Sequence, residues 1–335
     1  MNPDNSKEFG RLVDEATSIV HLTHVNPDAD GTGSALAMHR WLVGRGRPSR
    51  VLLTEAPTRA LSFLHEEGEL EVGDGSELDE STLVIVYDVS NPARLGCFQE
   101  AVTAHRGKAV LFDHHDASGT DDSWLCFVDE GAGATSQVVY ELFESLGVEV
   151  DERLAVPLYV ALIADTGSFN YGKTTPRTHE IAGHLLAAGV DPLAIHGLME
   201  GRHPLEGLRV AGEVLGKMEQ DAEDSRIAFA QLSASQVARA GRGGLDSLHL
   251  VNYTIAIDGV VAGVLMSEVS EDLTRLSFRS KGDVSVVETA RELGGGGHRN
   301  AAGASFPGTP DQARGPVLST LRRHIQSQLG SPEKS

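Results

Sequence analysis

Apolar residues in the first 190 positions fall into short continuous runs, and most of these runs end in polar residues. Continuous apolar runs are typical of parallel strands covered on both faces, and their alternation with helical segments is typical of an α/β fold. Residues 158–164 are apolar throughout and fit either a helix or an extended segment. We predict strands over 18–23, 50–53, 81–87 and 108–112, and helices over 7–16, 35–44, 135–143 and 176–188.

The pattern changes in the second half of the chain. Residues 191–220 are predicted to form a largely helical linker, which Pro192 and Pro204 interrupt. After it we predict strands over 226–232, 254–258, 260–268 and 274–279, and helices over 286–293 and 311–329. The fold class is therefore α/β over residues 1–190, with a mainly parallel sheet flanked by helices, followed by the linker and a smaller α+β domain over residues 221–330.

The charge of the chain disfavours one class of function. The sequence has 28 basic and 48 acidic residues, which gives a net charge of −20, and only 5% of its residues are aromatic. Proteins that coat long nucleic acids need a basic surface and, for single strands, aromatic stacking platforms. We therefore expect no binding of long duplex nucleic acid, whereas a small phosphate substrate held by local cations and metals is compatible with this composition.

The expected location follows from other features of the sequence. The longest apolar runs fall far short of the ~18 residues of a membrane span, and the polar N-terminal residues do not resemble a signal peptide. Cys97 and Cys126 lack the spacing of a metal site, and both are expected to be buried free thiols. We therefore predict a cytoplasmic protein with no membrane partner.

The most distinctive polar sequence is Asp113-His114-His115, which directly follows an apolar run. Ligands of open α/β sheets bind at the carboxyl ends of the strands, where these side chains would lie. Alone, the three residues would fit a polar turn. Further aspartates also follow apolar runs, and we expect them at strand ends near the same place: Asp28 with Asp30, Asp88, and Asp165.

Carboxylates gathered in this way need cations, because like charges side by side raise each other's pKa values. Aspartates mixed with His24 and His114 suit Mn²⁺ better than Ca²⁺ or Mg²⁺, which prefer shells of oxygen ligands. Enough ligands are present for two ions about 3.5–4 Å apart that share one carboxylate. Taken by itself, the segment 24–34 fits better the start of a helix, with one capping aspartate and a solvated neighbour.

These motifs together resemble the DHH phosphoesterase superfamily. The first motif is His24-x-x-Pro27-Asp28-x-Asp30-x-x-Gly33-Ser34, the second contains Asp88, the third is Asp113-His114-His115 and the fourth is Asp165-Thr166-Gly167. Residues 294–303 resemble the glycine-rich signature of the DHHA1 domain. The size of the chain and the order of its motifs resemble the nano-RNase and pAp-phosphatase branch over nearly the whole length.

The resemblance implies a role for each motif residue in the first domain. One metal ion would be held by His24, Asp28 and Asp88, and the other by Asp30, Asp88, His114 and Asp165. Asp88 would be the shared ligand, and Asp113 would orient the site from behind the ligands. His115 would contact the scissile phosphate or assist proton transfer. The ions are expected to be two Mn²⁺, with Mg²⁺ or Co²⁺ as alternatives.

In the second domain the resemblance implies substrate-binding residues. Backbone N–H groups of Gly295, Gly296 and Gly297 would meet an oxyanion without side-chain obstruction, and His298 would reach the substrate. Arg279 and Ser280 would hold a terminal phosphate, which a guanidinium group binds through two hydrogen bonds. Of the remaining polar residues, Thr135-Ser136 is expected to cap a helix, and His179 is expected to lie on the surface.

The expected activity is Mn²⁺-dependent degradation of short oligoribonucleotides, about two to five nucleotides long, by two-metal hydrolysis. Dephosphorylation of 3′-phosphoadenosine 5′-phosphate (pAp) is expected as well, and the family resemblance suggests a homodimer. A family-II pyrophosphatase would lack the glycine-rich signature, a RecJ-type exonuclease would need further domains, and alanyl-tRNA editing would use only the second domain. A cyclic dinucleotide phosphodiesterase stays open, and a non-catalytic nucleotide sensor is the alternative of a different class.

Overall fold

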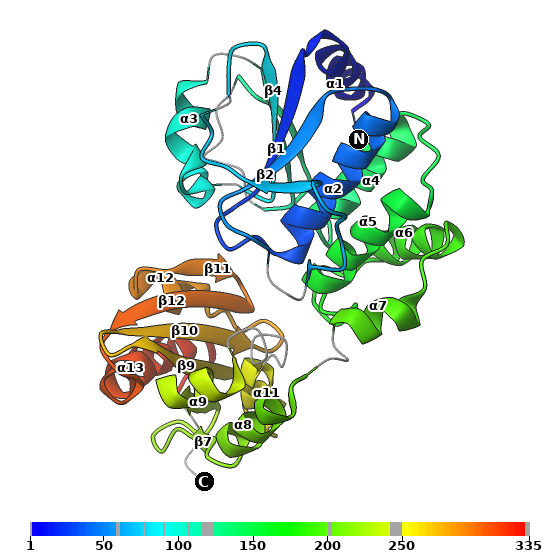
Figure 1. Ribbon diagram of the computed structural model, residues 1–335. Coiled ribbons are helices and arrows are strands. Elements are labelled where there is room, and N and C mark those ends of the chain that lie inside the picture. The colour runs from blue at the N-terminus through cyan, green and yellow to red at the C-terminus, as the bar shows by residue number, and fades with distance from the viewer. Residues whose placement is uncertain are drawn as a thin grey trace. The chain divides into compact units, whose positions relative to one another are not determined.

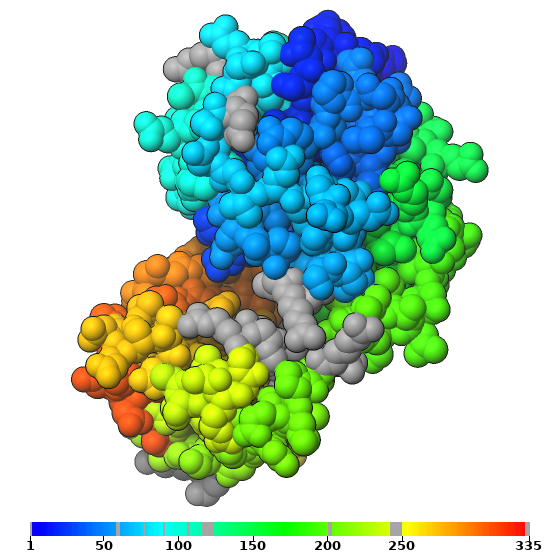
Figure 2. All heavy atoms as spheres, in the orientation of Figure 1, coloured from blue at the N-terminus to red at the C-terminus, as the bar shows by residue number. Residues whose placement is uncertain are grey.

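The computed structural model divides the chain into two compact units, residues 1–199 and residues 200–335 (Figure 1). It describes residues 2–57, 61–76, 78–89, 91–105, 108–115, 123–199, 203–241 and 250–331. Within each unit, side chains fill the spaces between the ribbons, as the space-filling view shows (Figure 2). The division falls between α7 (Pro192–Met199) and α8 (Leu205–Leu215), inside the range predicted as a linker. The linker itself stays a prediction.

The first unit contains a six-stranded sheet in which every pair of neighbours is parallel. Along the sheet the order is β3-β2-β1-β4-β5-β6. The strands are β1 (Ser18–Leu22), β2 (Ser49–Leu53), β3 (Leu70–Val72), β4 (Thr82–Tyr87), β5 (Ala109–Asp113) and β6 (Leu125–Val128). The predicted parallel sheet is confirmed, although the sequence pattern did not indicate β3 and β6.

Both faces of this sheet are apolar because successive side chains of a strand point to opposite faces. Ile85 of β4 packs in one buried cluster with Ile19 and Val110, while its neighbour Val84 packs in another with Val20 and Leu111. Helices cover the two faces separately (Figure 1). The first cluster lies under α1 (Pro3–Glu15), α2 (Ala29–Gly44), α4 (Thr135–Ser145) and α5 (Glu152–Asp165), and the second lies under α3 (Phe98–Ala104).

Residues 158–164, for which the sequence left two alternatives, are helical and belong to α5. Asp165 is therefore the last residue of a helix, and its predicted position at a strand end is wrong. The apolar side chains of α5 are buried on several sides, so the segment lacks the one-sided periodicity of a surface helix. Helices α2 and α5 pack closely because Gly33 has no side chain. A Cβ atom at Gly33 would lie 2.5 Å from the Pro157 carbonyl oxygen.

Two further expectations for the first unit are wrong. Helix α2 begins at Ala29, six residues before the predicted start, because the Asp28 carboxylate accepts hydrogen bonds from the N–H groups of Asp30 and Gly31. Cys97 is exposed and Cys126 is half-buried, so neither free thiol is fully buried. Among the described residues no single helix is long and apolar enough to cross a membrane, although α6 (Pro176–Ala187) and α7, bent by 104°, meet the length and composition criteria as a pair.

The second unit is built on a mixed six-stranded sheet in the order β11-β12-β10-β9-β8-β7. Only the β8–β9 pair is parallel. Its strands are β7 (Glu219–Gln220), β8 (Ile227–Leu232), β9 (Ala262–Ser270), β10 (Leu273–Ser280), β11 (Gly296–His298) and β12 (Ala301–Pro307). Its described residues form the helices α8, α9 (Ala234–Ala240), α11 (Leu250–Ala256), α12 (Val287–Glu292) and α13 (Pro310–Leu329). The α+β prediction is confirmed.

One predicted strand of the second unit is wrong. Residues 254–256 lie in α11, where the Thr254 hydroxyl donates to the Val251 carbonyl at 2.6 Å. Helix α11 approaches β9 so closely that a Cβ atom at Gly263 would lie 1.9 Å from Thr254 Oγ1. The tertiary contact with β9 thus stabilises a helix over a segment whose β-branched residues favour a strand.

Candidate metal centre

The candidate site of the first unit lies at the carboxyl edge of the parallel sheet. His24 and Asp28 follow β1, Asp88 follows β4, and Asp113 is the last residue of β5. Parallel strands present their carboxyl ends at one edge, so these residues meet although they are far apart in the sequence. Asp30 comes from the first turn of α2 and Asp165 from the end of α5.

His24 links two of the aspartates. Its Nε2 atom lies 3.2 Å from Asp28 Oδ2 and 3.3 Å from Asp88 Oδ2. The other ring nitrogen, Nδ1, lies 2.8 Å from the Val25 carbonyl oxygen. A carbonyl can only accept, so Nδ1 carries the proton, and Nε2 is turned toward the carboxylates. This orientation of the ring is the one that a metal-binding histidine needs once Nε2 has lost its proton.

Asp88 occupies the centre of the site and is 4% exposed. Its backbone has φ of +59°, a left-handed conformation in which aspartate and asparagine are more frequent than most other residues. Its Oδ2 atom faces His24, while Oδ1 lies 3.7 Å from His114 Nε2 and 3.2 Å from His115 Nδ1. The two oxygens of one carboxylate therefore face different imidazoles.

His114 is fully buried and faces two further carboxylates. Its Nε2 atom lies 3.2 Å from Asp165 Oδ2 and 3.9 Å from Asp30 Oδ2. Its Nδ1 atom lies 3.2 Å from the Ala132 carbonyl oxygen, which again orients Nε2 toward the aspartates. Helix α5 thus supplies, from its last turn, a carboxylate to a site that is otherwise built on strand ends and on the start of α2.

Asp113 is buried and lies behind His114 and His115. Its Oδ1 atom accepts the backbone N–H groups of both histidines, at 2.7 and 3.0 Å, and lies 2.7 Å from His115 Nδ1. Its Oδ2 atom has no hydrogen-bond partner among the described residues. The carboxylate therefore fixes the backbone turn and the orientation of the His115 ring, which is the arrangement expected for a residue that orients its neighbours.

The pKa values show that this cluster carries more negative charge than the protein alone compensates. Burial, together with Asp88, raises the pKa of Asp30 well above its ordinary value and that of Asp165 to about 7. Burial lowers the pKa of His24 and His115, but hydrogen bonds to aspartates outweigh it and raise both to about 10. The same bonds hold the pKa of Asp88 below its ordinary value despite its burial. Protons balance the charge in this state, and divalent cations would do so in their place.

The donor set fits divalent metal ions. Ligand atoms of His24, Asp28 and Asp88 lie within 4.8 Å of one another, and so do those of Asp30, Asp88 and His114. Asp88 is common to both groups, and mixed carboxylate and imidazole ligands suit Mn²⁺ and similar ions. Asp165 belongs to neither group but adjoins His114. That these residues bind metal remains a prediction.

Two residues that the sequence did not assign to the site reach it. Lys173 donates from Nζ to the His114 carbonyl oxygen at 2.8 Å. Thr135, expected to be a helix cap, instead donates its hydroxyl to Asp88 Oδ1 at 3.2 Å. No local pattern marks either residue, because each contact joins segments more than 40 positions apart. His179 is exposed, as predicted.

The residues predicted to bind substrate in the second unit are partly engaged in the fold. Arg279 is half-buried and donates from Nη1 to the Phe278 carbonyl oxygen at 2.9 Å. The buried Ser280 donates to the Val284 carbonyl at 2.6 Å and accepts from Asn300 Nδ2 at 3.0 Å.

The glycine-rich residues serve the hairpin of β11 and β12. Gly295 donates its N–H to the Ala290 carbonyl at 2.8 Å, and Gly296, Gly297 and His298 form strand β11. A Cβ atom at Gly295 would lie 2.0 Å from the Gly303 carbonyl oxygen, and Gly297 has φ of +137°. The fold by itself therefore requires glycine at these two positions.

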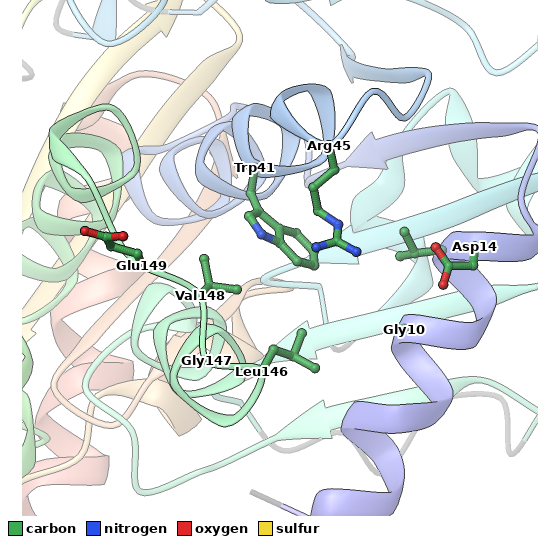
Figure 3. Close-up of a pocket in the computed structure, with 9 residues that line it drawn as sticks. Gly10, Asp14, Trp41, Arg45, Leu146, Gly147, Val148 and Glu149 are labelled. Atoms are coloured by element: carbon green, nitrogen blue, oxygen red, sulfur yellow. The ribbon is translucent and has the colours of Figure 1, made fainter.

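A surface cavity of about 420 Å³ in the first unit is separate from the metal centre (Figure 3). Arg45 extends over the Trp41 ring at 5.3 Å from its centroid. None of the predicted site residues lines this cavity, which is formed by Gly10, Val13, Asp14, Trp41, Arg45, Leu146, Gly147, Val148 and Glu149. The cavity gives no support to a second candidate active site.

Comparison with known proteins agrees with the family that the motifs resemble. The N-terminal domain of the DHH family matches residues 18–162, and the DHHA1 domain matches residues 227–326. The chain is 31% identical to the bifunctional oligoribonuclease and PAP phosphatase NrnA of Thermus thermophilus, over 94% of each sequence. It is 25% identical over 90% of its length to the cyclic-di-AMP phosphodiesterase GdpP of Geobacillus thermodenitrificans, of which it covers 46%.

The fold has a close counterpart among solved structures. An exopolyphosphatase-related protein from Bacteroides fragilis superposes with a TM-score of 0.86 at 23% sequence identity, over 97% of this chain and 96% of that one. The two family models and the relative at 31% identity over 94% of the chain show the family. The chain belongs to the DHH family, with a DHH domain followed by a DHHA1 domain, and is an enzyme that hydrolyses phosphoester bonds.

Proposed function

We propose that this protein is a Mn²⁺-dependent phosphoesterase that degrades oligoribonucleotides of about two to five nucleotides to mononucleotides by two-metal hydrolysis. It also removes phosphate from pAp. The name of the Thermus thermophilus relative, which describes both an oligoribonuclease and a PAP phosphatase, supports this pair of activities. The proposal includes a cytoplasmic location and a homodimer.

One observation carries the two-metal part of the proposal. The two carboxylate oxygens of Asp88 face two different groups of ligands, one with His24 and Asp28 and the other with His114 and Asp30. A single carboxylate between two such groups is the arrangement of a shared ligand in two-metal hydrolases. Bound there, divalent ions would activate water for attack on phosphorus and stabilise the negative charge that develops.

His115 is the residue that we assign to the scissile phosphate. Asp113 holds its Nδ1 atom at 2.7 Å, so the direction of the ring is set before the substrate binds. The side chain is 19% exposed, in contrast to the fully buried His114. With Nδ1 engaged, Nε2 is the ring atom that would donate a hydrogen bond to the phosphate or a proton to the leaving oxygen.

Substrate binding by Arg279, Ser280, Gly295, Gly296, Gly297 and His298 remains part of the proposal. Arg279 is the member of this set with the strongest chemical case, because a guanidinium group binds phosphate through two charge-assisted hydrogen bonds. A few cations of this kind suffice for a short substrate, whereas a long one needs a basic surface that a chain of net charge −20 does not supply.

The test is hydrolysis by the purified protein with Mn²⁺ and with an EDTA control. The substrates are pApA, a long RNA, pAp, linear and cyclic dinucleotides, and pyrophosphate. We expect fast release of mononucleotides from pApA, release of phosphate from pAp, and slow cleavage of the long RNA. Cleavage of pyrophosphate alone would contradict the proposed role of the second unit.

A cyclic dinucleotide phosphodiesterase is the second candidate. Its specific support is the similarity to the GdpP phosphodiesterase across 90% of this chain. A higher kcat/KM for cyclic di-AMP than for pApA in the same assay would favour it. Nucleotide binding without turnover of any substrate would instead indicate a sensor.

A further inference from the structure

Helix α4 begins without a cap of its own. Its N-cap residue is Ala134, which has no side chain to accept a hydrogen bond from the first turn. The first N–H groups of a helix need acceptors when they are buried. Here the acceptor is Asp30, whose Oδ2 and Oδ1 atoms accept the N–H groups of Thr135 at 2.7 Å and Ser136 at 3.0 Å. A predicted metal ligand therefore caps a helix that begins 105 residues later.

Thr135 also contacts the carboxylate at the centre of the site. Its hydroxyl lies 3.2 Å from Asp88 Oδ1, the oxygen that faces His114 and His115. Thr135 is 0% exposed, so water does not compete for this hydrogen bond. One residue thus binds two ligand carboxylates, Asp30 through its backbone and Asp88 through its side chain.

We propose that Thr135 is a positioning residue of the metal centre, which holds the Asp30 and Asp88 carboxylates in the orientation that metal ions require. The inference rests on the proposed function, since it assumes that these carboxylates bind metal. A carboxylate that is already oriented loses less conformational freedom on binding an ion. Partners of this kind commonly change metal affinity by about 10- to 100-fold when they are removed.

The structure offers a matched control for the hydroxyl of Thr135. Thr32 of α2 is also 0% exposed, and its Oγ1 atom has no hydrogen-bond partner among the described residues. Thr135→Val and Thr32→Val therefore make the same chemical change at two buried positions of the same unit. Only the first removes a hydrogen bond to a ligand carboxylate.

The test is the affinity of the full-length protein for Mn²⁺, measured by isothermal titration calorimetry after removal of bound metal. Thermal unfolding of each metal-free variant is recorded beside it. We expect Thr135→Val to weaken Mn²⁺ binding by about 10- to 100-fold, Thr135→Ser to restore most of it, and Thr32→Val to match the wild type. Rescue by serine would not follow from a purely structural role, because serine lacks the methyl group that packs in the core.

The possible outcomes distinguish a failure of the role of Thr135 from a failure of the proposed function. If the wild type binds Mn²⁺ and Thr135→Val binds it equally well, the role of Thr135 is overturned while the proposed function stands. Equal losses in Thr135→Ser and Thr135→Val would also overturn the role of the hydroxyl. If Thr135→Val does not fold, the affinity of Thr135→Ser decides. A wild type that binds no Mn²⁺ would overturn the proposed function together with this inference.

Discussion

The two units differ in the contacts that their predicted site residues make. In the first unit, the buried side chains of Asp88, Asp30 and His114 face one another across the site, and burial together with Asp88 raises the pKa of Asp30 well above its ordinary value. In the second unit, Ser280 and Gly295 already make hydrogen bonds that the fold needs. Carboxylates that converge on imidazoles point to a metal ion even where, like Asp30, they also cap a helix, whereas residues that complete a hairpin do not by themselves point to a ligand.

The largest expected effect comes from Asp88, the centre of the first unit. Asp88→Asn should lower kcat/KM for pApA by roughly 10³-fold or more, because both ligand groups lose a charged oxygen. Asparagine tolerates the left-handed backbone at φ of +59°, so this variant isolates the charge, whereas Asp88→Ala, also expected to be inactive, adds backbone strain. Asp4→Asn, at a side chain 88% exposed, is the control. Near-normal activity of Asp88→Asn would contradict the shared-ligand assignment.

A second prediction concerns the protons that balance the site. His24, with a pKa raised to about 10, and Asp165, with a pKa raised to about 7, must both lose protons to bind metal. Affinity for Mn²⁺ should therefore rise between pH 6 and 8, by about tenfold per pH unit for the His24 proton and more steeply below pH 7, where Asp165 is also protonated. Calorimetry in buffers of different ionisation enthalpy counts the protons. An affinity that does not change with pH would show that these groups are not displaced.

The same pKa shifts predict how the stability of the metal-free protein changes with pH. The raised pKa of His24 and His115 stabilises the fold below pH 6.5, and this contribution is lost as the pH rises through about 10. The raised pKa of Asp165 contributes below its ordinary value of 3.8 and is lost as the pH rises through about 7. The Tm of EDTA-treated protein should fall from pH 7 to 10, and added Mn²⁺ should reverse the fall. A constant Tm over this range would be inconsistent with the charge balance described above.

Removal of the Arg279 charge in the second unit is expected to affect substrate binding alone. Arg279→Gln should raise the KM for pApA by about tenfold to hundredfold through loss of charge-assisted hydrogen bonds, while the affinity for Mn²⁺ stays unchanged. Arg275→Gln is the matched control, since Arg275 lies on the same strand β10 and is exposed. An unchanged KM in Arg279→Gln would contradict the proposed contact between Arg279 and the substrate.

The smallest expected effect comes from Ser280 and tests whether this residue serves the fold or the substrate. Ser280→Ala removes the hydrogen bond to the Val284 carbonyl and the one from the Asn300 amide, which should lower the free energy of unfolding by about 1–3 kcal/mol. Denaturant titration measures this loss against Ser277→Ala, a half-buried serine of the same strand. A raised KM with unchanged stability would instead assign Ser280 to the substrate, as the family resemblance implies.

Much of the fold could be predicted from local patterns. Apolar runs such as 83–86 marked the buried parallel strands because both faces of the sheet are covered. The prediction was wrong where packing outweighed local preference. The helix over 254–256 depends on its contact with Gly263, and the helix that ends at Asp165 is buried on several sides. Short edge strands such as β3 carry too few residues for a periodic signal.

The sequence by itself determined the chemistry of the candidate site. The residue types and order of His24, Asp28, Asp88 and Asp113-His114-His115 predict a divalent-metal site, because the carboxyl ends of parallel strands share one edge, and their resemblance to the DHH motifs implies a phosphoesterase. Only the tertiary structure decided how these groups meet. The two-sided position of Asp88, the capping of α4 by Asp30 and the approach of Thr135 and Lys173 join segments that are far apart in the sequence. Such contacts depend on packing between elements, which no local sequence pattern predicts.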